Sequence, residues 1–285
     1  MSNLKKLKKY GPWALILGSS EGLGYAFAEN CAEQGLNVIL TGRKEAKLQA
    51  AADKLKAAHK VDVKYFTCDI TDPECAKKLT PQLDDYDIGL FVYNAACEPG
   101  GPFVRLPIED INTAIRGNGT TAAEITWYIA RKMAKRGRGF IGLVTSLASM
   151  GGMAYYVPYS ASKGYELLLG EGLWYELKEY GVDAATFVVG ETATPNYNKT
   201  QDKKADEDKG KKKTFGERER RPITPDECAD NLMAQIGDGP RLYANPKDKR
   251  SVKLLNMMSD KMRVSFLSKA AMDGYDATFN NLLDL

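Results

Sequence analysis

Apolar runs that read as β-strands alternate with segments of helical periodicity along most of the chain. The runs cover residues 13–18, 37–42, 61–68, 88–95, 139–146 and 182–190, with a further short run at 241–245. Strands that are apolar on both faces and separated by helices are typical of a parallel sheet covered on both sides. We therefore expect one α/β domain over residues 1–285, built on a doubly wound parallel sheet.

Two later segments break this alternation. Residues 191–222 form a long polar connection whose centre, 199–221, holds ten basic and six acidic side chains. A connection of this length inside a compact domain is typical of a lid or of a disordered insertion, and as a lid we expect it to cover the substrate. From about residue 246 the pattern is helical and rich in methionine, which predicts a C-terminal helical extension. Between the two, Thr224 and Glu227 have the spacing of a helix capping box.

Composition and charge exclude several classes of protein. The chain carries 40 Lys and Arg against 37 Asp and Glu, and this net charge of +3 is too small for a dedicated nucleic-acid-binding protein. No run approaches the ~18 apolar residues of a membrane span. Five scattered cysteines favour neither a disulfide framework nor a zinc site, and the single histidine, His59, leaves little room for Ser-His-Asp catalysis. We expect a cytoplasmic protein with no metal, membrane or nucleic-acid partner.

A glycine-rich turn joins the first predicted strand to the first predicted helix. The sequence LGSSEGLG places Gly18, Gly22 and Gly24 where a dinucleotide-binding turn needs them. Gly18 lets the chain leave the strand sharply, Gly22 lets backbone approach a pyrophosphate, and Gly24 lets the helix pack against the sheet. The context predicts a Rossmann-type sheet that binds a dinucleotide at the carboxyl ends of its strands. Glu21, inside the turn, is the feature that opposes phosphate binding.

The end of the second predicted strand indicates which dinucleotide is bound. An acidic residue there would accept hydrogen bonds from the ribose 2'-hydroxyl of NAD. This chain has Thr41, Gly42, Arg43 and Lys44 instead. Because a guanidinium group suits a 2'-phosphate, Arg43 favours NADP(H).

Three side chains near the fifth predicted strand form a candidate proton-transfer set. Tyr159 follows Ser146 by thirteen residues, and Lys163 follows Tyr159 by four. A helix beginning near Pro158 would stack Tyr159 and Lys163 on one face. We expect the lysine ammonium to favour the tyrosine phenolate and so to bring an otherwise weak base into range.

With the YNAA run at 93–96 and Asn118, these features resemble the short-chain dehydrogenase/reductase family over about residues 12–245. The resemblance implies that Tyr159 is the general acid and base, that Lys163 binds the nicotinamide ribose, that Ser146 bonds the substrate oxygen and that Asn118 supports a proton relay. It also implies a set of cofactor-binding residues. These are Gly18, Ser20, Gly22, Leu23, Gly24, Arg43, Asp69, Ile70, Asn94, Tyr159, Lys163, Gly190, Thr192 and Thr194.

More narrowly, the runs LILGSSEGLG, TGRKEAKL, TPDEC and YANPKDKRSV resemble NADP(H)-dependent bile-acid hydroxysteroid dehydrogenases, above all the branch that acts at carbon seven. This resemblance implies a secondary alcohol and ketone pair on a steroid, and a homodimer or homotetramer formed by the two long helices after the fourth and fifth strands. Two alternatives stay open. One is a reductase of a different ketone, such as a 3-oxoacyl group on a carrier that docks on the basic segment 199–221. The other is a non-catalytic NADP(H) sensor.

Overall fold

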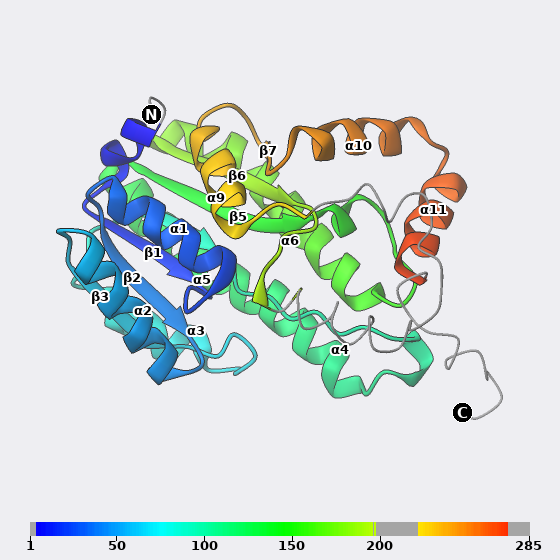
Figure 1. Cartoon of the computed structure of the whole chain (residues 1–285), viewed down its shortest axis with the longest axis horizontal. Coiled ribbons are helices and arrows are strands. Elements are labelled where there is room, and N and C mark those ends of the chain that lie inside the picture. The colour runs from blue at the N-terminus through cyan, green and yellow to red at the C-terminus, as the bar shows by residue number, and fades with distance from the viewer. Residues whose placement is uncertain (1–3, 196, 198–221, 273–285) are drawn as a thin grey trace.

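Seven parallel strands form one sheet at the centre of the molecule (Figure 1). The computed structural model describes residues 4–195, 197 and 222–272. The strands are β1 (Trp13–Leu17), β2 (Asn37–Gly42), β3 (Val63–Thr67), β4 (Ile88–Tyr93), β5 (Gly139–Ser146), β6 (Val182–Val189) and β7 (Arg241–Tyr243). Their order is β3-β2-β1-β4-β5-β6-β7, and each neighbouring pair is parallel. The predicted doubly wound sheet is confirmed, and its order reverses between β1 and β4.

Helices connect the strands and cover both faces of the sheet (Figure 1). They are α1 (Gly22–Glu33), α2 (Glu45–Ala58), α3 (Cys75–Leu79), α4 (Ile108–Ile115), α5 (Ala122–Arg136), α6 (Val157–Glu176), α9 (Pro225–Ala234), α10 (Pro246–Met257) and α11 (Asp260–Met272). A π-helical turn, Arg116–Thr121, separates α4 from α5. Within the described residues, none of these helices combines the length and the apolar character needed to cross a bilayer.

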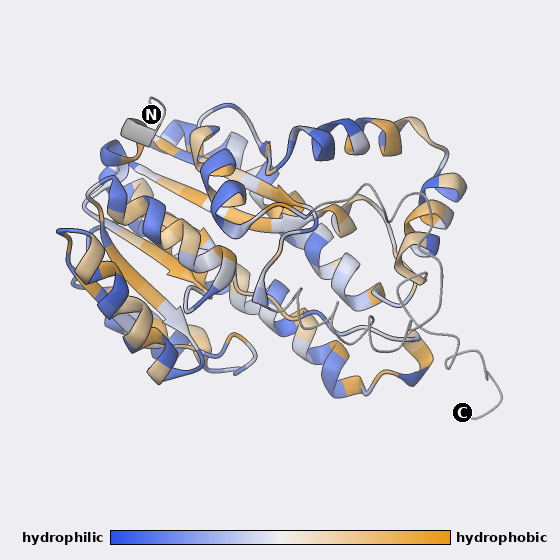
Figure 2. Cartoon of the chain, in the orientation of Figure 1, coloured by the Kyte–Doolittle hydropathy of each residue, from blue (hydrophilic) through white to orange (hydrophobic). Residues whose placement is uncertain are grey.

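The alternation of side chains along each strand produces two separate cores. In β1, Ile16 joins the core that α1, α2 and α9 cover, whereas Leu15 and Leu17 join the core beneath α3, α5 and α6. The strands are apolar on both faces because both faces are buried, and Figure 2 shows them mainly in the hydrophobic colour. This packing fixes the carboxyl ends of the strands, where the loops of the site begin.

The two C-terminal helices pack on the end of the sheet beside β6. Val252 and Leu255 of α10 and Leu267 of α11 share a third buried cluster with Leu167 of α6 and Val188 of β6. Figure 1 shows α10 and α11 extending past the end of the sheet and returning toward α6. The C-terminal helices thereby approach the loop that follows β5.

Most strand boundaries agree with the sequence prediction, with small differences at the ends. The third strand begins at Val63, two residues later than predicted, and the Asp62 amide just before it donates to Asn37 Oδ1 at 2.9 Å. The seventh strand ends at Tyr243, and Asn245 instead caps α10 by accepting from the Lys247 amide at 2.9 Å. The predicted capping box of α9 is present, since Thr224 Oγ1 accepts from the Glu227 amide and Glu227 Oε2 accepts from the Thr224 amide.

Candidate active site

The glycine-rich turn lies between β1 and α1, next to the point where the strand order reverses. Gly18 and Gly22 have positive φ angles of 73° and 61°, which side-chain-bearing residues rarely adopt. A Cβ atom on Gly18 would lie 2.8 Å from Ala95 Cα, and one on Gly24 would overlap the Gly18 carbonyl oxygen. The turn therefore has room only for glycine, and it leaves bare backbone at the start of α1. Such a cradle fits a pyrophosphate group.

The acidic side chain within this turn is neutralised by an ion pair. Both carboxylate oxygens of Glu21 lie within 2.8 Å of Lys47 Nζ on α2. The negative charge of Glu21 therefore opposes anion binding at this turn less than the sequence suggests. Arg43, just after β2, is exposed and makes no ion pair with any residue that the structure describes, so its guanidinium group is free to meet an anion.

Two further residues of the proposed cofactor set lie at the carboxyl ends of β3 and β4. Asp69 Oδ1 accepts hydrogen bonds from the Thr71 amide at 3.0 Å and the Thr71 hydroxyl at 2.8 Å. Asn94 Nδ2 donates to the Gly18 carbonyl oxygen at 3.0 Å. Asn94 thus fixes the glycine turn against β4, and the parallel sheet brings both side chains to the same edge.

Ser146 ends β5 and meets the first turn of α6. Its hydroxyl oxygen accepts from the Ala148 amide at 3.2 Å, and its side chain is close enough to Tyr159 to act on the pKa of that hydroxyl. As predicted, a helix carries Tyr159 and Lys163 one turn apart, with Pro158 in its first turn. Lys163 Nζ lies 6.0 Å from the centre of the Tyr159 ring. The structure therefore brings the three side chains of the candidate proton-transfer set together.

The charge around Tyr159 differs from the sequence expectation. The pKa of Tyr159 is raised above its ordinary value, first by burial and then by the carboxylate of Glu98, while the Ser146 side chain lowers it. We expected Lys163 to favour the phenolate. The structure gives a reason why it does so little: Lys163 Nζ is paired with Glu166 Oε2 at 2.7 Å, and both side chains are buried.

Asn118 lies in the π-helical turn and holds two neighbouring segments together. Its Oδ1 accepts from the Cys97 amide at 2.8 Å, and its Nδ2 donates to the Cys97 carbonyl oxygen at 2.8 Å and to Ser162 Oγ at 2.9 Å. π-Helical turns occur frequently at functional sites. The described contacts give Asn118 a positioning role, because its side chain is committed to the loop after β4 and to α6.

The loop after β6 lies against the glycine turn. A Cβ atom on Gly22 would lie 3.2 Å from Pro195 Cδ and 3.6 Å from Thr194 Cβ. Thr192 forms a bridge with Ile223, so the two ends of the long polar connection meet. The centre of the predicted lid, residues 198–221, lies outside the described residues. Gly190, Thr192 and Thr194 are thus at the same edge of the sheet as the other predicted cofactor residues.

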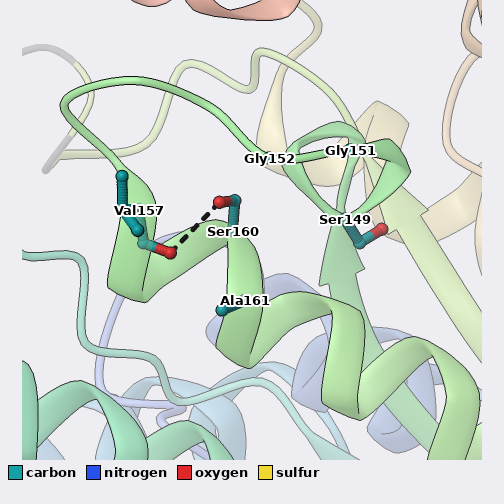
Figure 3. A pocket seen from close by; sticks show the side chains of 6 residues that line it. All are labelled: Ser149, Gly151, Gly152, Val157, Ser160 and Ala161. Atoms are coloured by element: carbon teal, nitrogen blue, oxygen red, sulfur yellow. Dashed lines mark hydrogen bonds between the residues drawn. The ribbon is translucent and has the colours of Figure 1, made fainter. Parts of the chain in front are cut away.

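Two cavities border the first turn of α6. One of about 320 Å³ is lined by Ser149, Gly151, Gly152, Val157, Ser160 and Ala161. Figure 3 shows these residues on the loop after β5 and on α6, with the Ser160 hydroxyl donating to the Val157 carbonyl oxygen at 3.2 Å. A second cavity of about 500 Å³ has a mainly apolar lining that includes Phe103, Ile111 and Tyr165. The residues lining the two cavities do not include Ser146 or Tyr159, so these spaces adjoin the proton-transfer set and do not enclose it.

The sequence reasoning missed two residues of this site. Glu166 carries a buried charge three positions after Lys163, and a basic and an acidic residue at this helical spacing are the signal that could have found it. Ser162 links Asn118 to the backbone of Tyr159, because its hydroxyl donates to the Tyr159 carbonyl oxygen at 2.9 Å. A serine inside a helix gives no such signal.

Comparison with known proteins identifies the family. Residues 12–205 match the family described as short chain dehydrogenase, a span that includes the glycine turn, Ser146, Tyr159 and Lys163. The chain belongs to the short-chain dehydrogenase family and is an oxidoreductase of this type.

Several proteins with known activities are similar to this chain. A 7beta-hydroxysteroid dehydrogenase of Mediterraneibacter gnavus is 30% identical over 189 residues, which cover 66% of this chain and 72% of that protein. A very-long-chain 3-oxoacyl-CoA reductase of Ajellomyces capsulatus is 34% identical over 189 residues, covering 62% of this chain and 55% of that protein. The solved structure of a 7beta-hydroxysteroid dehydrogenase superposes with a TM-score of 0.81 at 27% identity and covers 93% of this chain and 99% of that one.

Proposed function

We propose that this oxidoreductase interconverts a secondary alcohol and a ketone on a hydroxysteroid such as a bile acid, with NADP(H) as its cofactor. The observation that carries the proposal is the proximity of the Ser146 and Tyr159 side chains, close enough for Ser146 to lower the pKa of Tyr159, with Lys163 one helical turn further on. They stand at the same edge of the sheet as the glycine turn. When bound, NADP(H) gives hydride to the substrate carbon or takes it away.

The residues of the chain handle the proton and the developing charge. In the reductive direction, Tyr159 donates its hydroxyl proton to the carbonyl oxygen, and Ser146 donates a hydrogen bond to the same oxygen. The raised pKa of Tyr159 keeps it in the acid form that this direction needs. In the oxidative direction, Tyr159 must first lose its proton, so alcohol oxidation requires a higher pH.

The residues at the carboxyl ends of the strands support NADP(H) as the cofactor. The cradle formed by Gly18, Gly22 and Gly24 suits the pyrophosphate, and the start of α1 offers backbone N–H groups to it. Arg43 is exposed beside this turn and suits a 2'-phosphate, whereas the strand end carries no carboxylate to bind a free 2'-hydroxyl. We propose that Ser20, Leu23, Asp69, Ile70, Asn94, Gly190, Thr192 and Thr194 complete the cofactor site.

A steroid substrate is supported by the similarity to two 7beta-hydroxysteroid dehydrogenases and by the mainly apolar spaces beside α6. The loop 151–154, which leads into α6, is bordered by α11: the Ala154 amide donates to Ser268 Oγ at 3.0 Å. A rigid apolar ligand suits the apolar spaces beside α6. Its burial releases water from apolar surface, and a rigid ligand loses little conformational entropy on binding.

The similarity to a very-long-chain 3-oxoacyl-CoA reductase favours a second candidate, the reduction of a 3-oxoacyl thioester. Absorbance of the reduced nicotinamide separates the two. Purified protein would be mixed with NADP+ or NAD+ and bile acids that differ in the position and face of each hydroxyl, and in parallel with NADPH and a 3-oxoacyl thioester. We expect one bile-acid isomer to respond with NADP+. Turnover of the thioester alone would favour the second candidate.

We further propose that the protein is a homodimer or homotetramer of the cytoplasm. Large apolar side chains are exposed on the two long helices α5 and α6, among them Trp127 at 61%, Leu168 at 67% and Tyr175 at 76%. A second copy of the chain would cover them. The five cysteines are free thiols, which fits a reducing compartment.

A further inference from the structure

A carboxylate is buried directly behind the proposed proton-transfer set. Glu166 lies on α6 one turn after Lys163 and is fully buried, while Lys163 is only 2% exposed. Glu166 Oε2 accepts a hydrogen bond from Lys163 Nζ at 2.7 Å. The proton transfer described above gives Glu166 no role, although a buried charge is costly to maintain.

The ion pair fixes the direction of the Lys163 ammonium group. An ammonium has three N–H donors at tetrahedral angles. One donates to the Val144 carbonyl oxygen at 2.8 Å and a second donates to Glu166 at 2.7 Å. The third is thereby left for the side of the site that Tyr159 and the cofactor ribose would share. Without Glu166, only the hydrogen bond to the Val144 carbonyl oxygen would hold the Lys163 ammonium group, and the group could rotate about it.

The second oxygen of Glu166 is also informative. Oε1 is buried and has no hydrogen-bond partner among the residues that the structure describes. Burial raises the pKa of Glu166 to about 7, even though the neighbouring Lys163 lowers it. The other titratable groups that face Glu166 are Tyr93 from β4 and Cys97 from the loop after β4. Neither brings a second positive charge that would lower the pKa of Glu166 further.

The charge of Glu166 reaches Tyr159. The groups that act on Tyr159 are Glu98 from the loop after β4, Ser146 from the end of β5, and Tyr156 and Glu166 from α6 and the residue preceding it. A negative Glu166 opposes the formation of the phenolate, and a protonated Glu166 leaves the positive charge of Lys163 uncompensated. Glu98 and Tyr156 also raise the pKa of Tyr159.

We infer that Glu166 is a positioning residue for Lys163, and that gain or loss of its proton sets the net charge that the Lys163–Glu166 pair presents to Tyr159. This inference rests on the proposed function, because it takes Tyr159 as the group that moves the substrate proton. No oxidant or further reactant is required, since Glu166 takes up and releases a proton in exchange with solvent.

The variant Glu166→Gln tests the charge separately from the geometry. Glutamine keeps an oxygen that can accept from Lys163 but has no negative charge. We expect the rising limb of kcat for alcohol oxidation to move to lower pH by about one unit, which is roughly a tenfold faster rate below the limb. The KM for NADP+ should change little. A pH profile that superimposes on that of the unchanged protein would overturn the inference.

A second variant and a matched control separate positioning from folding. Glu166→Leu removes the acceptor as well, and we expect kcat to fall about tenfold or more across the pH range, because the ammonium is no longer directed. Glu171→Gln is the control: it makes the same substitution on the same helix, at an ion pair with Arg241 that lies away from the site. Its pH profile should match that of the unchanged protein.

A spectroscopic measurement on the unchanged protein needs neither a variant nor turnover. Carbon-13 labelling of the glutamate carboxyl groups allows their titration to be followed by NMR. We expect one resonance to titrate near 7, well above the ordinary glutamate value of 4.5. Absence of a carboxyl group titrating near 7 would overturn the inference even if steroids are turned over. If that resonance is present but no alcohol is oxidised, the proposed function fails and the buried proton site stands.

Discussion

Asn118 Nδ2 donates to Ser162 Oγ at 2.9 Å and so connects the π-helical turn before α5 to the helix that carries Tyr159. Ser162 passes the connection on, because its hydroxyl donates to the carbonyl oxygen of Tyr159 at 2.9 Å. The same asparagine binds the amide and the carbonyl oxygen of Cys97. One buried side chain, that of Asn118, thereby fixes the loop after β4 relative to the start of α6.

Replacing Asn118 by alanine should damage both stability and turnover. The change removes the side-chain partner of the partly buried Cys97 amide and carbonyl oxygen and one of the two hydrogen bonds of the Ser162 hydroxyl, which costs about 1–3 kcal/mol of unfolding free energy. We expect kcat to fall about 10- to 100-fold as Tyr159 loses its position. Chemical denaturation and kcat at saturating substrate would measure the two effects. Ser162→Ala removes the bond from Asn118 and the bond to Tyr159 but leaves both bonds of Asn118 to Cys97, so it should cost less. An Asn118→Ala protein with unchanged kcat would refute the positioning role.

Arg43 should decide between the two nicotinamide cofactors. Arg43→Ala removes the guanidinium group that would bind a 2'-phosphate. We expect the KM for NADP+ to rise about 10- to 100-fold, because one or two charge-assisted hydrogen bonds are lost. The KM for NAD+ should stay the same or fall. Lys44→Ala, at the neighbouring exposed position, is the control and should change the KM for NADP+ less. Equal effects of Arg43→Ala on both cofactors would contradict the assignment.

The capping box of α9 should contribute to stability without affecting catalysis. Thr224→Ala removes the oxygen that accepts from the Glu227 amide, so the unfolding free energy should fall by about 1 kcal/mol. Thr224→Ser retains the hydroxyl and should change the unfolding free energy little. Thermal unfolding would measure both variants, and kcat should be the same in each. A fall of equal size in the serine variant would show that the cap is not the cause.

The buried proton of Glu166 should give folding stability a defined pH dependence. Its pKa is about 7 in the folded protein against an ordinary 4.5 in the unfolded chain. Between these values, the unfolded chain releases the proton while the folded chain keeps it. The contribution of Glu166 to the unfolding free energy is therefore complete below about pH 4.5 and is lost as the pH rises through 7. Relative to Glu166→Gln, the unchanged protein should lose on the order of 1–3 kcal/mol over that range. If the unfolding free energies of the two proteins changed with pH in the same way, this prediction would be contradicted.

The fold could be predicted because its signals are local. Apolar runs separated by helical segments specify a buried parallel sheet, and the positive φ angles of Gly18 and Gly22 match the turn that their spacing predicted. The capping box at Thr224 and Glu227 was likewise readable because both members lie within four residues. Strand ends follow less directly from a local pattern, because they meet side chains of other strands, as the Asp62 amide before β3 meets Asn37 of β2.

The candidate site was only partly predictable from the sequence. The spacing of Tyr159 and Lys163 on one helix followed from helical geometry, and the structure brings Ser146 to them from β5. The spacing did not predict the charge balance, because burial and the carboxylates of Glu98 and Glu166 act on Tyr159 through the folded structure. The pKa of a buried group depends on surroundings that no local pattern describes.

The most direct test of the account is Tyr159→Phe, measured for turnover and for cofactor binding in the same preparation. Phenylalanine keeps the ring but has no proton to give, so kcat should fall about 10²- to 10⁴-fold. Binding of NADPH, followed by its fluorescence, should be nearly unchanged, because the glycine turn and Arg43 are intact. Loss of turnover with retained binding would support Tyr159 as the acid and base. Turnover that survives the substitution would contradict the proposed mechanism.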